Sequence, residues 1–331
     1  MTASAGRRGS TGVLHDAVVV GGGAAGLAAA TWLGRYRRDT VVVDSGEYRA
    51  ASVESSHGYL ARDPQQPLEL LETAREQLTA YPTVRIHRGR VASARADGEQ
   101  FELALDDGET LRCCRVVLAT GVVDACPELE NFDEHYGASA FHCPSCDGFD
   151  SADRDVIAYG WDEHLVGFSA SLLDWARSVT VLTGGQRFTG DEACLDVLGR
   201  HDIEVVETTA VRLVGRRGAM EGVELADGRV VPGSLLFFSV AHEPQTDLAR
   251  GLGCRIDDEG YVAVDANAET SVRGVYAAGD LTPGMQLVQV AAAKGTIAGI
   301  NAALSLHGES GSPRSPEPAP DAPGEVDDAR P

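Results

Sequence analysis

Short apolar runs of strand character alternate with a helical pattern at the start of this chain. Residues Asp16–Gly21 (DAVVVG) form a run that is typical of a buried strand. The segment LAAATWLGRY that follows has the apolar spacing of a helix, and Thr40–Val43 is a second, β-branched run. This order predicts a βαβ unit, in which a helix joins two parallel strands.

The turn between the first strand and the helix carries the glycine pattern G-x-G-x-x-G. Gly21 suits a tight turn, Gly23 lets backbone approach a pyrophosphate, and Gly26 lets the helix pack on the strand. The helix N-terminus attracts phosphate groups. Asp44 ends the second strand about 20 residues on, where a carboxylate can hold a ribose hydroxyl. Together these features predict a dinucleotide-binding site.

Later segments extend this unit. Pro67–Ala80 has the pattern of an amphipathic helix, and Thr83–Leu118 has strand patterns joined by Asp-Gly turns, which predicts a β-meander. The sequence Ala119–Gly121 then suits a second close approach of backbone to the ligand. Gly274–Asp280 is another buried strand, and the apolar helix after Gln289 can present its amino end to an anionic or electron-rich ligand.

A second βαβ pattern begins after residue 150. It consists of a strand at Asp155–Tyr159, a helix at Leu165–Ala176 and a strand at Val179–Leu182. Its turn, Gly160–Glu163, contains one glycine, a bulky tryptophan and two acids that fall at the helix start. Carboxylates there cap the helix and repel a pyrophosphate. Because Thr183–Arg187 also supplies neither an acid nor an arginine pair, we do not expect an ordinary second nucleotide site.

The segment His142–Gly148 (HCPSCDG) lies between the two βαβ patterns. Cys143 and Cys146 can close a small redox disulfide when Cys143 stands at a helix start, where the helix dipole favours a thiolate. Asp147 could then carry the proton that thiol–disulfide chemistry moves. The alternative is half of a structural zinc site. That site needs four ligands, and the chain has no second Cys-x-x-Cys or His-x₃-His partner, so we predict a redox pair and no metal.

Composition and charge limit the possible partners. The chain has 331 residues and a net charge of −22, which argues against nucleic acid and anionic membrane surfaces. Seven cysteines without regular spacing do not form a disulfide framework, so a reducing compartment fits better. We interpret the remaining cysteines as small packed residues: Cys113, Cys114, Cys126, Cys194 and Cys254.

The two ends of the chain lack the patterns of folded elements. We expect residues 1–14 to be a flexible leader and residues 308–331, rich in Pro, Ser, Gly and acids, to be a disordered tail. Arg7-Arg8 ahead of an apolar run imitates a twin-arginine signal, but Asp16 interrupts it and the run contains the glycine turn. No apolar run approaches the length of a membrane span, so we predict a cytoplasmic protein.

In this order, the motifs resemble those of the low-molecular-weight thioredoxin reductase family of flavoproteins. The resemblance covers about residues 15–306. It implies an α/β fold of two Rossmann-like three-layer ββα domains, the central one inserted into an FAD domain. The FAD domain would comprise residues 15–120 and 245–307, and residues 121–244 would form the central NADPH-type domain with the dithiol. The motifs that carry the resemblance are Gly21–Gly26, Cys143–Gly148, the linker His242–Thr246 and Ala277–Asp280.

The resemblance also implies residue roles. Cys146 would face the flavin, Cys143 would exchange with the external sulfur, and Asp147 would be the acid or base. His142 would help to keep Cys143 as a thiolate, or would only pack. The residues implied in FAD binding are Gly21, Gly23, Ala24, Ala25, Gly26, Asp44, Val91, Ala119, Thr120, Gly121, Gly279, Asp280, Gln289 and Val290. The loop Ser55–Gly58 either approaches this ligand or carries an ordinary loop histidine at His57.

The chain departs from the family at the second nucleotide turn. NADPH-using members have a glycine-rich loop and a His-Arg-Arg type motif, whereas this chain has Trp161–Glu163 and Thr183–Gly185. Related flavoproteins without NADPH motifs oxidise small-molecule dithiols with oxygen, or reduce thioredoxin-like proteins with another electron donor. We therefore expect an FAD-dependent thiol–disulfide oxidoreductase that does not use NADPH efficiently. The direction of electron flow between the flavin and the substrate is left open. The alternatives are an NADPH-dependent thioredoxin reductase and a non-catalytic flavin redox sensor.

The resemblance further implies a homodimer. The partner would be a small-molecule dithiol or a thioredoxin-like protein, with oxygen or another electron donor or acceptor. If no nucleotide has to be carried to the flavin, the domain rotation of NADPH-dependent relatives is unnecessary. We therefore predict one dominant domain orientation, with Cys146 close to the flavin.

Overall fold

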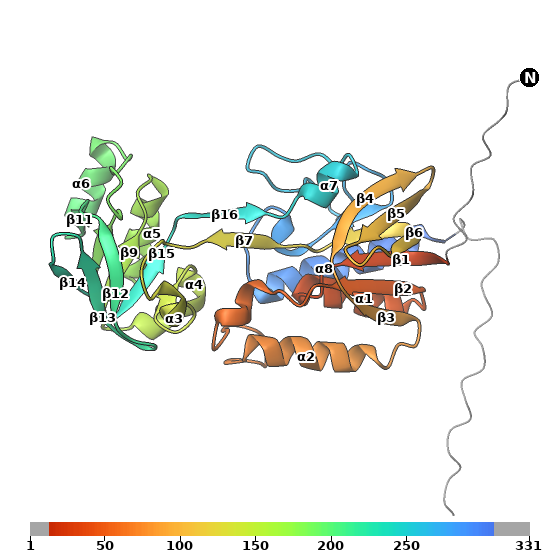
Figure 1. Ribbon diagram of the computed structural model, residues 1–331, viewed down its shortest axis with the longest axis horizontal. Coiled ribbons are helices and arrows are strands. Elements are labelled where there is room, and N and C mark those ends of the chain that lie inside the picture. Colours follow the sequence, from red (N-terminus) through yellow and green to blue (C-terminus); the bar gives the residue numbers. More distant parts are fainter. Residues whose placement is uncertain (1–12, 308–331) are drawn as a thin grey trace, which may run out of the picture.

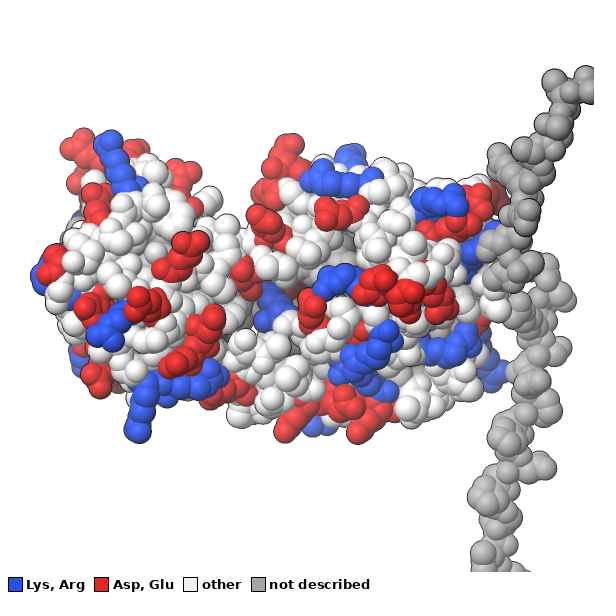
Figure 2. Space-filling view, viewed as in Figure 1, with Lys and Arg blue, Asp and Glu red and all other residues white. Residues whose placement is uncertain are grey.

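A computed structural model describes residues 13–307 of the protein, which form two bodies joined by a narrow ladder of two strands (Figure 1). The predicted leader and tail lie outside the described residues, except that Leu14 already opens the first strand. Figure 2 shows acidic and basic side chains interspersed over both bodies, with the surface hollowed between them. No helix in residues 13–307 has the length and apolar character needed to cross a membrane.

The larger body is built on a seven-stranded sheet with the order β3-β2-β1-β6-β5-β4, in which β17 pairs with β6. Strands β3, β2, β1, β6 and β17 are parallel, and β4 and β5 are antiparallel. The strands are β1 (Leu14–Val20), β2 (Thr40–Asp44), β3 (Val84–Arg88), β4 (Val91–Asp97), β5 (Gln100–Leu105), β6 (Thr110–Leu118) and β17 (Val275–Ala277). The predicted meander over 83–118 is thus wrong for β3, which extends the parallel set beside β2.

Two hydrophobic clusters cover the two faces of this sheet. One contains residues of three helices, α1 (Ala24–Arg35), α2 (Pro67–Leu78) and α8 (Val288–Ser305). The other contains residues of β4, β5 and the short helix α7 (Asp247–Gly251). Glycine lets α1 and α8 touch, because a Cβ on Gly295 would lie 2.0 Å from the backbone oxygen of Ala25. This close packing brings the N-termini of both helices to the same end of the sheet.

The smaller body repeats the same layering. Its parallel sheet has the order β11-β10-β9-β15-β8, and a three-stranded antiparallel sheet, β12-β13-β14, packs on one face. Helices α5 (His164–Leu172) and α6 (Glu192–Arg200) cover the other face. Helix α5 ends earlier than its pattern predicted. The strands are β8 (Ala140–Phe141), β9 (Asp155–Tyr159), β10 (Ser178–Leu182), β11 (Glu204–Val206), β12 (Ala210–Arg216), β13 (Ala219–Leu225), β14 (Val230–Pro232) and β15 (Leu235–Phe238).

The chain passes between the bodies twice, through the antiparallel strands β7 (Val122–Ala125) and β16 (Ala241–Pro244). The smaller body is therefore inserted between β6 and the C-terminal part of the larger one, with the short helix α3 (Phe132–His135) following β7. The predicted α/β fold of two three-layer units, one inserted into the other, is confirmed. The predicted domain boundaries, 120/121 and 244/245, lie next to one end of this ladder.

Candidate functional site

A cavity of about 730 Å³ is lined by residues of both bodies and is the centre of the candidate site. At one end it contains the first glycine turn, and elsewhere in its wall are Cys143, Cys146 and Asp147. It therefore brings together parts of the chain that are far apart in sequence. The other predicted residues in its wall are Gly21, Gly23, Ala24, Ala25, Val91, Ala119, Thr120, Gly121, Gly279, Asp280 and Gln289. Gly26, Asp44 and Val290 are not in the wall.

The glycine turn has the geometry that a phosphate site requires. Gly21 has φ +113°, and a Cβ there would lie 2.3 Å from the backbone oxygen of Ala119. A Cβ on Gly26 would lie 1.9 Å from the backbone oxygen of Gly21, so only glycine lets α1 approach this closely. Gly23, the N-cap of α1, has no protein atom within 4 Å of its Cβ position. Its side of the turn is thus open toward the cavity, at the N-terminus of a 12-residue helix.

Asp44 lies behind this turn and is only 1% exposed. Its carboxylate accepts hydrogen bonds from the Tyr48 hydroxyl at 2.8 Å and from Arg88 at 2.9 Å, and it pairs with Arg75 at 3.3 Å. A Cβ on Gly22 would collide with this carboxylate. The structure therefore surrounds Asp44 with protein donors, and in this arrangement it supports the glycine turn. The sequence did not predict these partners, since they lie on α2, at the end of β3 and in a loop.

Two polar atoms in and near the cavity wall lack a partner among the described residues. The Oδ1 atom of Asp280 and the Oε1 atom of Gln289 are both buried without a hydrogen bond. Buried acceptors without donors are rare in folded proteins, and a ligand rich in hydroxyl or N–H groups would satisfy them. Gly279, the residue before Asp280, lies between the starts of α1 and α8, since a Cβ there would be 2.8 Å from the Cβ of Ala25 and 3.9 Å from that of Ala291. The open glycine turn suits the pyrophosphate of a dinucleotide, and the unpaired oxygens of Asp280 and Gln289 suit its hydroxyl or N–H groups. Together they fit an extended dinucleotide such as FAD.

Arg49 links the cavity wall to the ladder between the bodies. Its guanidinium donates to both carboxylate oxygens of Asp124, at 2.6 and 2.8 Å, and to Asp280 at 2.9 Å. Burial opposes ionisation of Asp124, but the hydrogen bonds from Arg49 hold the pKa of this carboxyl below its usual value. The pair was not predicted, because the two residues are 75 positions apart and lie in a single 3-10 turn, Arg49–Ser52, and in the short strand β7.

The segment Arg49–His57, which we call the bridging segment, also holds the two bodies against each other. A Cβ on Gly137 would lie 2.1 Å from the backbone oxygen of Ser52, so the smaller body approaches this segment closely. Its polar contacts with β7 and the smaller body include Arg49–Asp124, Glu54 N–H to the Gly137 oxygen, Glu54–Arg217, Arg217 to the Ser52 oxygen and His57–Asp150. In this orientation Cys146 lines the same cavity as the glycine turn. That Cys146 lies close to the flavin stays a prediction.

Cys143 and Cys146 form a disulfide with a Cα–Cα distance of 5.3 Å. Cys143 is the N-cap of the short helix α4 (Pro144–Asp147), and its sulfur accepts the backbone N–H of Cys146 at 3.1 Å. The predicted position of the first cysteine at a helix start is confirmed. Pro144 favours this start, because its fixed φ suits the first turn and no N–H is lost there. A donor at the Cys143 sulfur would stabilise a thiolate after reduction.

Asp147 is the acid beside the disulfide, and it is 7% exposed. Burial raises the pKa of its carboxyl to about 7, which the positive charge of His57 opposes and the negative charge of Asp150 reinforces. A carboxyl with a pKa near neutrality can both accept and release a proton at physiological pH. Its place in the cavity wall next to Cys146 therefore suits the predicted proton transfer.

His142, directly before Cys143, is buried in an aromatic group. Its Nδ1 lies 3.3 Å from the hydroxyl of Tyr136, and both rings pack near Phe238. Burial lowers the pKa of His142 against the attraction of Asp124, so the ring is neutral at pH 7. A neutral ring packs well here but supplies no positive charge to a thiolate. Of the two interpretations given above, this geometry favours packing.

The second βα turn differs from the first. The Asp162 carboxylate accepts the backbone N–H of His164, the first residue of α5, at 3.1 Å. The Trp161 side chain packs on the hydrophobic cluster under the antiparallel sheet, and its backbone oxygen accepts the N–H of Thr189. The carboxylate cap predicted at this helix start is confirmed for Asp162, whereas Glu163, at the N-cap position, makes no capping side-chain hydrogen bond. The Asp162 carboxylate brings negative charge to the helix end where a pyrophosphate would bind.

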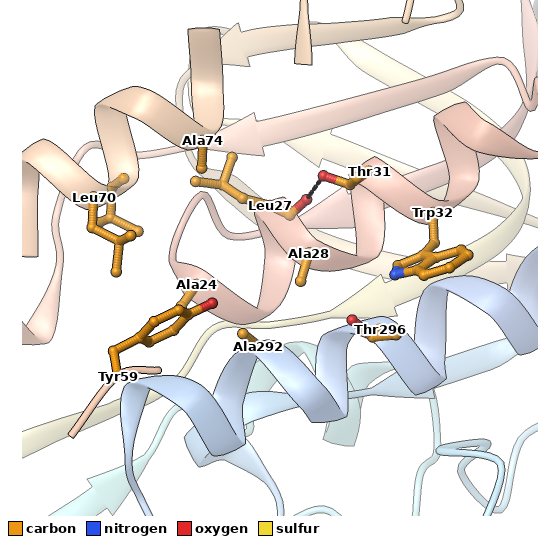
Figure 3. A pocket seen from close by; sticks show the side chains of 11 residues that line it. Ala24, Leu27, Ala28, Thr31, Trp32, Tyr59, Leu70, Ala74, Ala292 and Thr296 are labelled. Atoms are coloured by element: carbon orange, nitrogen blue, oxygen red, sulfur yellow. Dashed lines mark hydrogen bonds between the residues drawn. The ribbon is translucent and has the colours of Figure 1, made fainter. Parts of the chain in front are cut away.

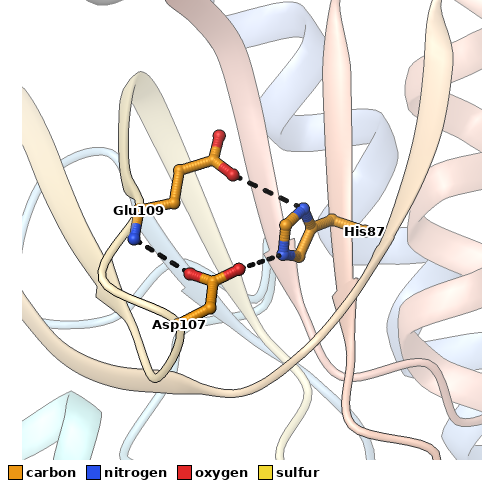
Figure 4. A group of neighbouring side chains, drawn as sticks. All are labelled: His87, Asp107 and Glu109. Atoms are coloured by element: carbon orange, nitrogen blue, oxygen red, sulfur yellow. Dashed lines mark hydrogen bonds and ion pairs between the residues drawn. The ribbon is translucent and has the colours of Figure 1, made fainter.

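A group with metal-ligand chemistry lies away from the disulfide, on the larger body. His87, Asp107 and Glu109 bring one ligand atom each within 4.8 Å of one another (Figure 4). The Nε2 atom of His87 lies 3.4 Å from Asp107, and both carboxylates are about half exposed, at 51% and 53%. Because both acids are exposed and already pair with His87, we interpret the three residues as a surface ion-pair cluster between β3 and the turn before β6. We assign no metal to it.

A second, smaller cavity of about 240 Å³ lies between α1, α2 and α8 (Figure 3). Its wall is mostly apolar and includes Leu27, Trp32 and Leu70. The Thr31 hydroxyl points back to its own helix and donates to the backbone oxygen of Leu27 at 2.8 Å. Neither cysteine of the disulfide reaches this cavity, so we place the chemistry in the larger one.

Comparisons with known proteins agree with this geometry. Residues 15–295 match the family described as pyridine nucleotide-disulphide oxidoreductase. The chain is 30% identical over 311 residues to thioredoxin reductase tcpT of Claviceps purpurea, a match that covers 90% of this chain and 96% of tcpT. The crystal structure of HlmI is similar, with a TM-score of 0.83 and 34% identity over 88% of this chain and 93% of HlmI. A putative thioredoxin reductase TrxB from Bacillus anthracis has a TM-score of 0.83 and 28% identity, over 89% and 99%.

The family match covers both βα turns and the disulfide, and it implies a flavin cofactor, FAD. In this chain, one cavity combines the open glycine turn, the disulfide and a buried acid. The chain therefore belongs to the pyridine nucleotide-disulphide oxidoreductase family and is a flavin-dependent disulfide oxidoreductase of the thioredoxin reductase type.

Proposed function

We propose that this protein exchanges electrons between bound FAD and a substrate dithiol or disulfide through Cys143 and Cys146, without efficient use of NADPH. One observation carries the proposal. The disulfide shares a cavity with the open glycine turn, whereas a carboxylate occupies the N-terminal end of the helix after the second turn. Electrons have a short route to a flavin, while the usual place for NADPH is electrostatically unfavourable.

The proposed FAD site uses the residues that line the cavity. The N–H groups at the start of α1, beside Gly23, would hold the pyrophosphate. Asp280 and Gln289, with their unpaired oxygens, would accept hydrogen bonds from the ribityl chain or the flavin ring. Gly26 and Asp44 would support the turn from behind it. When bound, FAD supplies the acceptor and donor of two electrons.

In the oxidising direction, a substrate thiol loses its proton to Asp147 while its sulfur attacks Cys143. The Cys143–Cys146 bond breaks, and its electron pair stays on the Cys146 sulfur. A second substrate thiol then attacks the mixed disulfide, which releases the oxidised substrate and leaves Cys143 as a thiol. The two cysteines thus hold two electrons. FAD, held by the residues named above, would supply their acceptor, and oxygen or another compound would be the final acceptor. The reducing direction reverses these steps and needs an electron donor other than NADPH.

A small-molecule dithiol and a thioredoxin-like protein both present a pair of sulfurs that could reach Cys143. The relatives are named thioredoxin reductases, which keeps the NADPH-dependent reductase as the second candidate function. We also propose, from the family resemblance, that the protein is a cytoplasmic homodimer.

One experiment separates the candidate functions. The purified FAD-bound protein is mixed anaerobically with NADPH and, separately, with dithiothreitol, and the loss of flavin absorbance is followed. Air is then admitted and peroxide is measured. We expect fast bleaching by dithiothreitol only. Fast bleaching by micromolar NADPH would show the thioredoxin reductase function instead, and no response to either compound would favour a redox sensor. Rapid reoxidation with peroxide would identify a dithiol oxidase.

The same assay tests the role of Cys143. The Cys143→Ser variant should keep its flavin but lose exchange with dithiothreitol by at least about a thousandfold, since the hydroxyl cannot form a disulfide. Cys126→Ser is the matched control, because Cys126 is an exposed free cysteine in the same cavity wall. Normal bleaching of Cys143→Ser would contradict the role assigned to this sulfur.

A further inference from the structure

The only lysine of the chain, Lys294, lies on α8 and contacts one short segment of the larger body. Its ammonium donates to three backbone oxygens, those of Pro283 at 2.9 Å, Thr282 at 3.1 Å and Gly279 at 3.3 Å. An ammonium has three N–H donors, so these contacts use all of them. Lys294 therefore ties residues 279–283, which we call the Asp280 turn, to α8.

The Asp280 turn is held between α8 and α1. Gly279 has φ +77°, and a Cβ there would lie 2.8 Å from the Cβ of Ala25, in the first turn of α1. The Gly279 oxygen accepts the Thr282 hydroxyl at 2.9 Å in addition to the Lys294 ammonium. The first residues of both helices line the large cavity. The position of the turn relative to this cavity thus depends on its contacts with the two helices.

Asp280 is the residue of this turn that reaches the proposed flavin site. It lines the cavity, and its Oδ2 atom accepts a hydrogen bond from Arg49 at 2.9 Å. Its Oδ1 atom is buried without a hydrogen-bond partner among the described residues. Arg49 contacts the carboxylate itself, whereas Lys294 contacts the backbone that carries it. The position of the unpaired oxygen is therefore set by two cations that act on different parts of Asp280.

We propose that Lys294 is a positioning residue for the flavin: by holding the Asp280 turn, it places the unpaired Asp280 oxygen where FAD binds. This inference rests on the FAD site of the proposed function. Lys294 itself does not line the cavity, so its effect on FAD passes through the turn. A lysine suits this task better than an arginine, because three oxygens converge on a single nitrogen and a guanidinium spreads its donors over a plane.

FAD titration of the folded apoprotein, followed by flavin fluorescence, measures this effect. Lys294→Met removes the three donors and keeps an unbranched side chain, so FAD affinity should fall about tenfold. Lys294→Arg keeps the charge and part of the donors and should lose about threefold or less. Normal FAD affinity of Lys294→Met would overturn the proposal.

The matched control is Arg38→Met. Arg38 is a half-buried cation that donates to the backbone oxygen of Ala303, toward the other end of α8, at 2.9 Å, and it does not line the cavity. This variant should keep normal FAD affinity, because its lost hydrogen bond lies away from the Asp280 turn. A tenfold loss in Arg38→Met as well would mean that any weakening of α8 lowers FAD affinity, which would contradict a specific role of Lys294.

A double-mutant cycle tests whether Lys294 acts through Asp280. Asp280→Asn should weaken FAD binding by itself, and adding Lys294→Met should then cost less than about a further twofold. ADP, which contains no flavin, reports on the glycine turn, and its affinity should be the same in Lys294→Met and the unmodified protein. A full tenfold loss in the Asp280→Asn background, or an equal loss for ADP, would show that Lys294 does not act by positioning Asp280.

A second measurement needs no variant. By linkage, hydrogen bonds that favour FAD binding are themselves strengthened when FAD is bound. Because Lys294 is the only lysine, its acetylation by an N-hydroxysuccinimide ester is followed in one peptide by mass spectrometry. The reaction should be about tenfold slower in the FAD-bound protein than in the apoprotein, and equal rates would overturn the proposal. Failure of the FAD-bound protein to bleach with dithiothreitol would instead refute the proposed function and would leave these affinities and rates unchanged.

Discussion

The two βα turns of this protein have the same topology but different chemistry at the helix N-terminus. In the first, Gly23 precedes α1 and leaves open space at its Cβ position. In the second, Asp162 accepts the N–H of the first residue of α5. Both turns follow a buried parallel strand, so the fold alone offers two anion sites. What differs is whether a ligand or a side chain satisfies the free N–H groups.

Two units with the same fold therefore need not bind the same ligand. The smaller body has kept the layers of a nucleotide-binding unit, but the reactive groups that it brings to the cavity wall are the disulfide and Asp147. The bridging segment holds this contribution against the larger body. If the second turn binds no nucleotide, one orientation of the bodies is sufficient for the reaction. Contacts that fix this orientation, such as Arg49–Asp124, then do not impair function.

We expect the largest effect when an aspartate, as found in the second turn, is placed in the first turn. Gly23→Asp should weaken FAD binding by about a thousandfold, since an uncompensated charge facing a phosphate in a buried site costs about 4 kcal/mol. The fold should survive, because Gly23 has an ordinary φ of −79° and an open Cβ position. Flavin content after purification and titration of the apoprotein measure the effect.

A matched control places the same residue in the smaller body. Gly167 in α5 also has no atom within 4 Å of its Cβ position, so Gly167→Asp should keep normal FAD content. Equal FAD affinity of Gly23→Asp and the unmodified protein would refute the distinction between the two turns.

The sequence predicted the parts of the site that depend on local geometry. The glycine turn and the cysteine at a helix start follow from short-range rules of backbone conformation and capping. The bridging segment could not be predicted in this way. Arg49 and Asp124 are far apart in the chain, and a single charged residue outside any recognised motif looks like a solvated one. Asp44 shows the same limit, because its position was predicted, whereas its burial under Arg75 and Arg88 depends on tertiary packing.

The second effect concerns Asp147, the acid that the smaller body brings to the cavity. Its folded pKa, about 7, is above that of an exposed aspartate, so the folded state binds its proton more tightly than the unfolded state does. Stability from this group is complete at low pH and is lost as the pH rises through 7. Asp147→Asn should therefore raise the free energy of unfolding at pH 8 by about 3 kcal/mol, with little change at pH 4.

Urea denaturation at the two pH values measures this difference. Asp153→Asn, at an exposed aspartate outside the cavity, is the control and should change neither value. An Asp147→Asn variant as pH-sensitive as the unmodified protein would mean that Asp147 is not the buried acid described above.

The third effect tests the attachment of the two bodies. Arg49→Met leaves the Asp124 carboxylate, 6% exposed, without its guanidinium. We expect the free energy of unfolding to fall by about 2 kcal/mol, which is less than for a fully buried pair because Arg49 is 18% exposed. Adding Asp124→Asn should recover part of the loss, since the unpaired charge is then gone. Urea denaturation of the single and double variants measures this, and additive losses would contradict a direct pair.

The smallest effect is expected at the second turn. Asp162→Ala removes the carboxylate cap of α5 and should lower the free energy of unfolding by about 1 kcal/mol, as for other helix caps. The helix end then regains a free N–H, but Trp161 still fills the turn, and Thr183–Arg187 still supplies no group for a ribose or a 2′-phosphate. We therefore expect no bleaching by micromolar NADPH. If Asp162→Ala gained NADPH activity, the carboxylate alone would separate the two turns, and the packing of Trp161 would carry no part of the difference.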